Sequence, residues 1–123
     1  MSYKIECVIQ EMLCDAFGKL TGLKIKGADG YLLRQNGKEY NVFCPEKMPE
    51  KDNPSSCNAV FFSADTMLSL VNPANADLSQ ILTQAKCANK KVRLEIDKAG
   101  IENDSKEDNL IVLKNSFKSV AIL

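Results

Sequence analysis

Cysteines are the side chains in this sequence most able to do chemistry, and the chain that carries them has no histidine. Without histidine there is no Ser-His-Asp or Cys-His catalytic unit and no imidazole-ligated metal or haem. No C-x-x-C spacing occurs, so zinc-ribbon, thioredoxin and iron–sulfur patterns are missing. We expect a protein that is not an enzyme and needs no cofactor or metal, with reduced thiols of which several are small core residues. The cysteines are Cys7, Cys14, Cys44, Cys57 and Cys87.

The acidic residues also lack the spacing of a catalytic or metal site. Glu95 and Asp97 stand two residues apart, which places both on the polar face of one predicted strand. The acidic run from Glu102 to Asp108 lacks the D-x-D-x-D-G spacing of a calcium loop. The sequence thus points to binding rather than catalysis.

The charge balance bears on the class of partner. The chain has 16 Lys and Arg against 16 Asp and Glu. Affinity for nucleic acid depends mostly on a surplus of Lys and Arg, so nucleic acid is the less favoured partner. No apolar run approaches the roughly 20 residues that span a bilayer, and no signal-peptide pattern is seen. We expect a cytoplasmic protein, or a secreted one if Met1 stands in for a removed leader.

The N-terminal segment has two overlapping patterns. Apolar residues recur at helical spacing: Ile5, Val8, Ile9, Met12 and Leu13. This spacing predicts a helix over residues 5–16 that ends before Gly18. A strand is the alternative, because apolar residues also alternate: Tyr3, Ile5, Cys7 and Ile9.

A β-hairpin around Asn36-Gly37 is the strongest local prediction. Both residues of this pair tolerate the positive φ of a type I′ turn, and β-prone runs flank them. A two-residue turn pairs Arg34 with Glu39 and sorts the side chains onto two faces. The predicted core face carries Tyr31, Leu33, Tyr40, Val42 and Cys44. The predicted outer face carries Leu32, Arg34, Glu39, Asn41 and Phe43.

The second half alternates between strand and helix patterns. A loop over residues 45–56 precedes a strand over 57–63 and a short helix over 64–71. A second helix begins at Asp77, with Gln80 as its capping-box partner, and ends near Asn89. Its predicted buried face carries Leu78, Ile81, Leu82, Ala85 and Ala88. The last predicted strands cover residues 92–97, 110–113 and 117–123.

This element order predicts one mainly β domain with helices over residues 1–123. The favoured fold is a small OB-like β-barrel of five to six strands, with an N-terminal helix and another helix before the last strands. The alternative is an α+β sheet with helices on one face.

Two segments carry a family resemblance. Residues 78–85 and then 91–96 form a helix-then-strand pattern, and Cys44 and Cys57 each lie on a predicted strand. Together these resemble the OB-fold B subunits of bacterial AB5-type toxins, in their subtilase-cytotoxin-like branch, over residues 18–100. The resemblance implies a homopentamer, a glycan site on the outer barrel surface and a Cys44–Cys57 disulfide. Such a bond would contribute roughly 3 kcal/mol; two reduced thiols are the alternative.

The expected function is a non-enzymatic binding module that acts through a protein interface, with a second protein or with copies of itself. The candidate contact residues are Leu32, Arg34, Phe43, Phe62 and Arg93. Leu32 and Phe43 on one outer face predict a protein contact or a subunit interface, unless the N-terminal helix covers them. The alternative is binding of single-stranded nucleic acid, with Phe43 stacking on bases beside Arg34 and Arg93.

Overall fold

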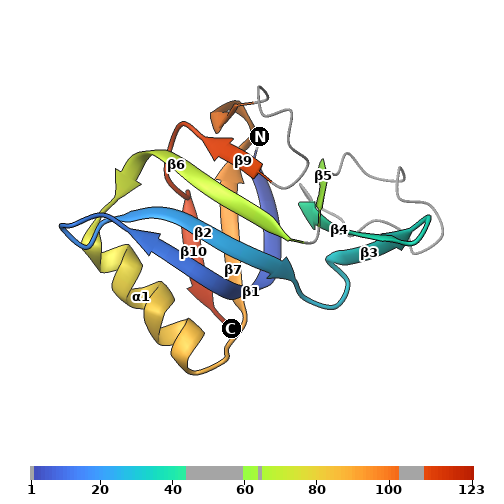
Figure 1. Ribbon diagram of the computed structural model, residues 1–123, viewed down its shortest axis with the longest axis horizontal. Helices are drawn as coiled ribbons and strands as arrows, with labels where there is room; N and C mark the ends of the chain where they lie inside the picture. The colour runs from blue at the N-terminus through green and yellow to red at the C-terminus, as the bar shows by residue number, and fades with distance from the viewer. Residues whose placement is uncertain (1, 44–59, 64, 103–109) are drawn as a thin grey trace.

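The computed structural model describes residues 2–43, 60–63, 65–102 and 110–123 (Figure 1). Within these ranges the chain is mainly β, with a seven-stranded sheet, a three-stranded sheet and one α-helix. The larger sheet contains β1 (Ser2–Cys14), β2 (Leu20–Gly27), β6 (Thr66–Ala74), β7 (Val92–Asp97), β8 (Ile101–Glu102), β9 (Leu110–Leu113) and β10 (Ser119–Ile122). The smaller sheet contains β3 (Leu32–Gln35), β4 (Lys38–Phe43) and β5 (Val60–Ser63). The helix α1 spans Ala76–Cys87, and a 3-10 turn over Lys98–Gly100 joins β7 to β8.

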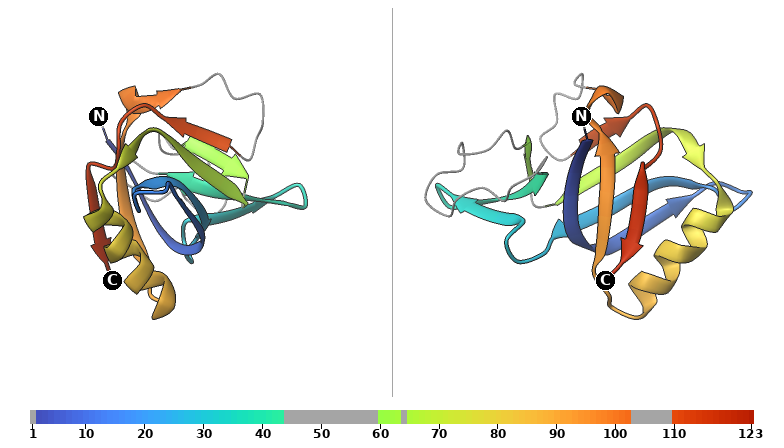
Figure 2. Two further views of the ribbon diagram at one scale, coloured as in Figure 1. Left: turned by 60° about the vertical axis from the view of Figure 1, so that its left-hand side comes forward. Right: turned by 180° about the vertical axis from the view of Figure 1, so that it is seen from behind.

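The strand order of the larger sheet is β10-β7-β1-β2-β6-β9-β8. Its neighbouring strands are antiparallel except β6 and β9, which are parallel. The described strands therefore form two open sheets, and the expectation of a closed barrel with five to six strands is corrected. The larger sheet curls so that β2, β6 and β9 lie on one side of the molecule and β7 and β10 on the other (Figures 1 and 2).

The predicted N-terminal helix is wrong, because residues 2–14 form the strand β1. β1 pairs with β7 along its first half and with β2 along its second half. Its buried residues are the alternating set Tyr3, Ile5, Cys7 and Ile9. Leu13, one of the apolar residues at helical spacing, is 52% exposed. Backbone pairing on both sides, with the next strand β2 and with the distant β7, outweighs the local helical spacing.

The predicted helix over residues 64–71 is also wrong, because Thr66–Ala74 is the strand β6. Thr66, Leu68 and Leu70 are buried and alternate with partly buried Met67 and Ser69. This period of two is typical of a strand with one face on the core, and β6 lies between β2 and β9.

The helix before the last strands is confirmed as α1, but it begins earlier than predicted. Its N-cap is Asn75, whose Oδ1 accepts a hydrogen bond from the Leu78 amide at 3.0 Å, so Asp77 lies in the first turn. The buried residues are Ser79, Leu82 and Ala85, whereas Ile81 is 42% exposed. The predicted end is right, because Asn89 adopts a left-handed conformation with φ of 52° just after the C-cap.

The β3–β4 hairpin has the predicted turn and register. Asn36 and Gly37 have φ of 52° and 77°, and Arg34 pairs with Glu39. The predicted division into a core face and an outer face is wrong near the base of the hairpin. Asn41 and Phe43 are fully buried there, as is Val42 from the opposite face. The base of β4 packs against the larger sheet, so both of its faces are covered, while the hairpin tip projects from the molecule (Figure 1).

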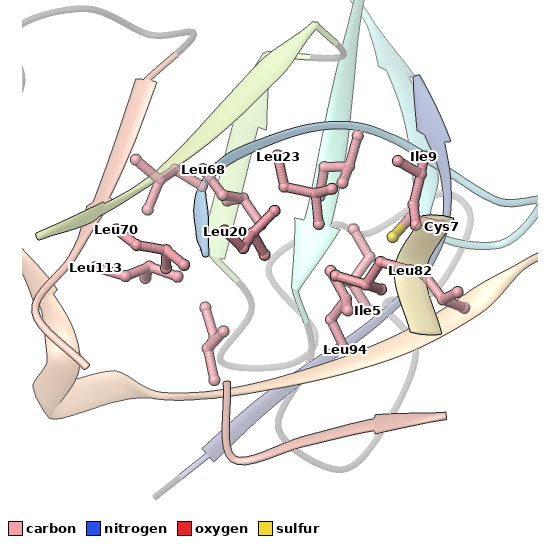
Figure 3. Packing of buried hydrophobic residues seen from close by; sticks show 14 of the residues in the cluster. Ile5, Cys7, Ile9, Leu20, Leu23, Leu68, Leu70, Leu82, Leu94 and Leu113 are labelled. Carbon is pink, nitrogen blue, oxygen red and sulfur yellow. The ribbon is translucent and has the colours of Figure 1, made fainter. Parts of the chain in front are cut away.

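The core lies inside the curl of the larger sheet (Figure 3). Inward side chains stack across the strands, as Leu23, Leu68 and Ile111 do on β2, β6 and β9. The helix contributes Leu82 and Ala85 and covers the end of the sheet away from the β3–β4 hairpin (Figure 1). The inward-facing side chains therefore form the core, and a binding surface has to be sought on the outward faces.

Candidate functional site

Apolar side chains gather on the outward face of β2, β6 and β9. The strand register places Gly22 beside Ser69, and Ser69 beside Val112. Met67 pairs in the same way with Leu110, one step along the same face. These side chains point away from the core, because the residues between them are the buried ones. We call this surface the apolar face; it consists of Leu13, Gly22, Met67, Ser69, Val71, Leu110 and Val112. Two charged residues, Glu11 and Lys24, pair with each other across β1 and β2 and border it beside Met67.

A glycine lets the side chains of the apolar face come together. A Cβ on Gly22 would lie 3.2 Å from Leu13 Cδ1 and 3.5 Å from Met67 Sδ. Leu13 from β1 and Met67 from β6 therefore close over the β2 backbone at Gly22. Leu13 is 52% and Val71 56% exposed, so the apolar face presents apolar side chains to solvent.

The opposite outward surface, on β1, β7 and β10, is charged and internally paired. Arg93 Nη2 lies 2.9 Å from Glu6 Oε1 across the β1–β7 ladder. Glu95 accepts hydrogen bonds from the hydroxyls of Ser2 (2.6 Å) on β1 and Ser119 (2.8 Å) on β10. These two hydrogen bonds, with smaller contributions from the charges of Lys4 and Lys118, hold the pKa of Glu95 below its usual range. Arg93, Glu6, Glu95, Ser2 and Ser119 are therefore engaged with one another across this surface.

The structure separates the residues expected to form a contact site. Arg34 is exposed on the hairpin, with its Nε 3.4 Å from Glu39 Oε2, and Leu32 is half-buried on the same strand. Arg93 lies on β7 of the other sheet. The two arginines thus belong to different sheets, and each has a carboxylate partner.

Phe43 and Phe62 are the two candidates that the structure does bring together. Their ring centroids lie 5.8 Å apart in an edge-to-face arrangement. Phe43 is fully buried in the core and Phe62 is half-buried against it, so the expectation that Phe43 points outward is wrong. This pair joins the smaller sheet to the core and offers no stacking platform.

The three cysteines in the described part of the chain are free thiols, one buried and two exposed. Cys44 and Cys57 lie outside the described residues. Burial raises the pKa of the Cys7 thiol, which keeps it protonated in the core. Cys14 and Cys87 are exposed free thiols. Residues 2–43, 60–63, 65–102 and 110–123 contain no cluster of three metal-binding side chains and no helix long and apolar enough to cross a membrane.

Sequence reasoning missed the apolar face. Its residues come from strands whose pairing partners are distant in sequence, and β6 was expected to be helical. The alternation in residues 66–71 and 110–113 was the available signal, since it marks Met67, Val71 and Val112 as outward residues.

Comparison with known proteins adds no relative. The chain matches no protein-family model, no curated protein and no solved structure.

Proposed function

We propose that this protein is a non-enzymatic binding module that holds a protein partner on the apolar face. The observation that supports the proposal most is the contrast between its two outward surfaces. Protein interfaces have a centre from which charged residues are depleted and in which methionine is enriched. The centre of the apolar face has this composition, with Met67, Leu13 and Val112 around Gly22, and the charged residues Glu11 and Lys24 stand at its border. On the surface of β1, β7 and β10, by contrast, Arg93 pairs with Glu6, and Glu95 is hydrogen-bonded to Ser2 and Ser119.

The strand connections support an OB-like module. β1, β2 and β6 follow one another as antiparallel neighbours, and α1 then leads to β7, which returns to β1. After the 3-10 turn, β8 pairs with β9, and β9 lies parallel to β6. This order follows the five-stranded, partly open Greek-key barrel of OB-folds, with the β3–β5 sheet inserted between its second and third strands. OB-folds bind their ligands on the face of strands two and three, and here those strands, β2 and β6, contribute Gly22, Met67 and Ser69 to the apolar face.

A protein is a better partner for this surface than a single-stranded nucleic acid. Binding of single strands needs exposed aromatic side chains on which bases stack and a basic groove that follows the backbone. The apolar face carries no aromatic or arginine side chain; Lys24 is its basic neighbour, beside Met67 in the register. Arg93, the expected nucleic-acid contact, is paired with Glu6 on the other surface.

A titration distinguishes these two partner classes. Purified protein is added to fluorescent oligo(dT) at low and at physiological salt, alongside Arg93→Glu as the variant that removes the expected contact. We expect no binding at physiological salt and no difference between the two proteins. Salt-sensitive binding of the wild type that Arg93→Glu abolishes would instead establish nucleic acid as the ligand.

The partner itself is tested by capture and reconstitution. Wild-type protein, Val71→Lys and the control Arg34→Glu are used as baits in the same cell extract. Val71 and Arg34 are both exposed, so both substitutions preserve the core. We expect a protein held by the wild type and by Arg34→Glu but lost with Val71→Lys, and the same ranking once that protein is purified. Equal capture by all three baits contradicts binding at the apolar face.

A further inference from the structure

A second surface stands apart from the apolar face, at the loop between β1 and β2. This loop, Asp15–Lys19, is called the tip here. It presents Phe17, which is 83% exposed, the most exposed large apolar side chain among the described residues. Leaving a phenyl ring in water forgoes the free energy that its burial would provide. A ring in this position suits an anchor that becomes buried only in a complex.

Hydrogen bonds hold the backbone of the tip, including that of Phe17, in a defined conformation. Asp15 Oδ1 accepts hydrogen bonds from the amides of Phe17 (2.9 Å) and Lys19 (3.0 Å). The Asp15 and Lys19 backbones are also bonded to each other at 2.9 Å. Ser79 Oγ on α1 donates to the Gly18 carbonyl at 2.7 Å, which ties the tip to the helix. A loop backbone that is already ordered loses little conformational entropy when the residue it carries binds.

A groove of about 520 Å³ lies between α1 and residues 116–120. Apolar side chains contribute to its lining from both sides: Leu78, Ile81, Phe117 and Val120. Its charged lining residues are Asp77 on the helix and Lys118 opposite. The volume falls in the range of sites that bury a small ligand or one large side chain.

Tip and groove are complementary in charge, and both have an apolar centre. The tip is an apolar residue between an acidic and a basic one, Asp15 and Lys19. The groove is an apolar slot between a basic and an acidic residue, Lys118 and Asp77. One orientation places Phe17 in the slot, Lys19 beside Asp77 and Asp15 beside Lys118. Matching of this kind fixes the register of a contact.

The tip cannot fill the groove of its own chain. Ser79, which binds the tip, and Ile81, which lines the groove, are two residues apart on α1. Each residue turns a helix by about 100°, so these two side chains point to nearly opposite sides. Tip and groove therefore flank the same helix, and the occupant has to come from elsewhere.

We propose that this chain self-associates, with Phe17 of one copy inserted into the groove between α1 and residues 116–120 of a second copy. Because tip and groove flank one helix, a two-fold axis near α1 forms both insertions at once and closes the assembly as a dimer. The contact is small and its affinity is expected in the micromolar range. The proposal does not depend on the apolar face.

Sedimentation equilibrium over the micromolar range tests the proposal on four proteins. Wild type should form a dimer, and Phe17→Ser should weaken association by about tenfold or more, as expected for an interface anchor. Ile81→Glu, on the groove side, should do the same. Val71→Ser is the matched control, an exposed apolar residue on the apolar face, and it should dimerise as the wild type does. Circular dichroism confirms that each variant is folded.

Charge reversal tests the register of the contact. Lys19→Glu should weaken the dimer, and Lys19→Glu combined with Asp77→Lys should restore it. A wild type that stays monomeric throughout overturns the proposal. So does a dimer that Phe17→Ser and Ile81→Glu leave intact, or one that Val71→Ser dissociates, because its contact would then lie on another surface.

Discussion

The side chain of Asn41 and the backbone of Gly27 join the two sheets. Asn41 Oδ1 accepts a hydrogen bond from the Gly27 amide at 2.6 Å, and both residues are buried. Asn41 Nδ2 donates to the Ser63 carbonyl at 3.2 Å. One amide side chain on β4 thus satisfies backbone groups at the end of β2 and of β5, which fixes the smaller sheet against the larger one.

Replacement of Asn41 should therefore destabilise the whole domain. Asn41→Ala leaves the Gly27 N–H buried without its acceptor, which costs about 1–3 kcal/mol. Denaturant unfolding followed by circular dichroism measures the loss. Asn72→Ala is the control, since Asn72 makes one exposed hydrogen bond, to the Lys114 carbonyl. Equal stability of the two variants would show that the Asn41 hydrogen bonds do not hold the sheets together.

Gly27 should be intolerant of any side chain. A Cβ at this position would lie 2.6 Å from the Tyr31 carbonyl oxygen and 3.0 Å from Asn41 Oδ1, so the backbone would have to move. Gly27→Ala is expected to cost about 1–3 kcal/mol in unfolding free energy, as overpacking does. Gly22→Ala provides the comparison, because its new Cβ would meet the flexible side chains of Leu13 and Met67 and should be tolerated better. The reverse order of stability would contradict this account.

Acid should lower the unfolding free energy of the domain through Glu95, which lies on the β1–β7–β10 surface. Its hydrogen bonds from Ser2 and Ser119 lower its pKa in the folded state. A carboxyl whose pKa is lower in the folded than in the unfolded state stabilises the fold above the unfolded pKa, and this stabilisation is lost as the pH falls. Unfolding free energies measured from neutral to acidic pH should fall less steeply for Glu95→Gln than for the wild type. Identical slopes of unfolding free energy against pH for the two proteins would show that Glu95 does not cause the acid sensitivity.

Phe43 should behave as a core residue and not as a contact residue. It is fully buried against Phe62, so Phe43→Ala should cost about 3–5 kcal/mol. Arg34→Ala, on the exposed side of the same hairpin, should change stability by less than about 0.5 kcal/mol. Chemical denaturation of both variants checks this. A Phe43→Ala variant as stable as the wild type would show that Phe43 is not a core residue.

Sequence predicted well those elements whose determinants are local. The Asn36-Gly37 turn and its register depend on two residues that accept positive φ, and both have it. The strand over residues 92–97 and the helix before it likewise have clear periods. The helix predictions for residues 5–16 and 64–71 are wrong, because both segments form strands. The choice between helix and strand depends on pairing partners that are distant in the chain, such as β7 for β1.

The candidate site was less predictable than the fold. The faces of the hairpin follow from its register, but which face is buried depends on where the larger sheet lies, and Phe43 and Asn41 are covered by it. The apolar face depends on cross-strand neighbours from β1, β2, β6 and β9, and no single segment contains it. Individual exposed residues such as Arg34 could be predicted from sequence; their arrangement into one surface could not.

The most direct test of the central claim is the comparison of partner capture by the wild type, Val71→Lys and Arg34→Glu at physiological salt, with nuclease present. We expect a protein that is retained by the wild type and by Arg34→Glu and is lost with Val71→Lys. Two results would contradict a protein-binding role for the apolar face. One is retention that is unchanged in Val71→Lys. The other is retention by all three baits without nuclease that is lost from all three with nuclease.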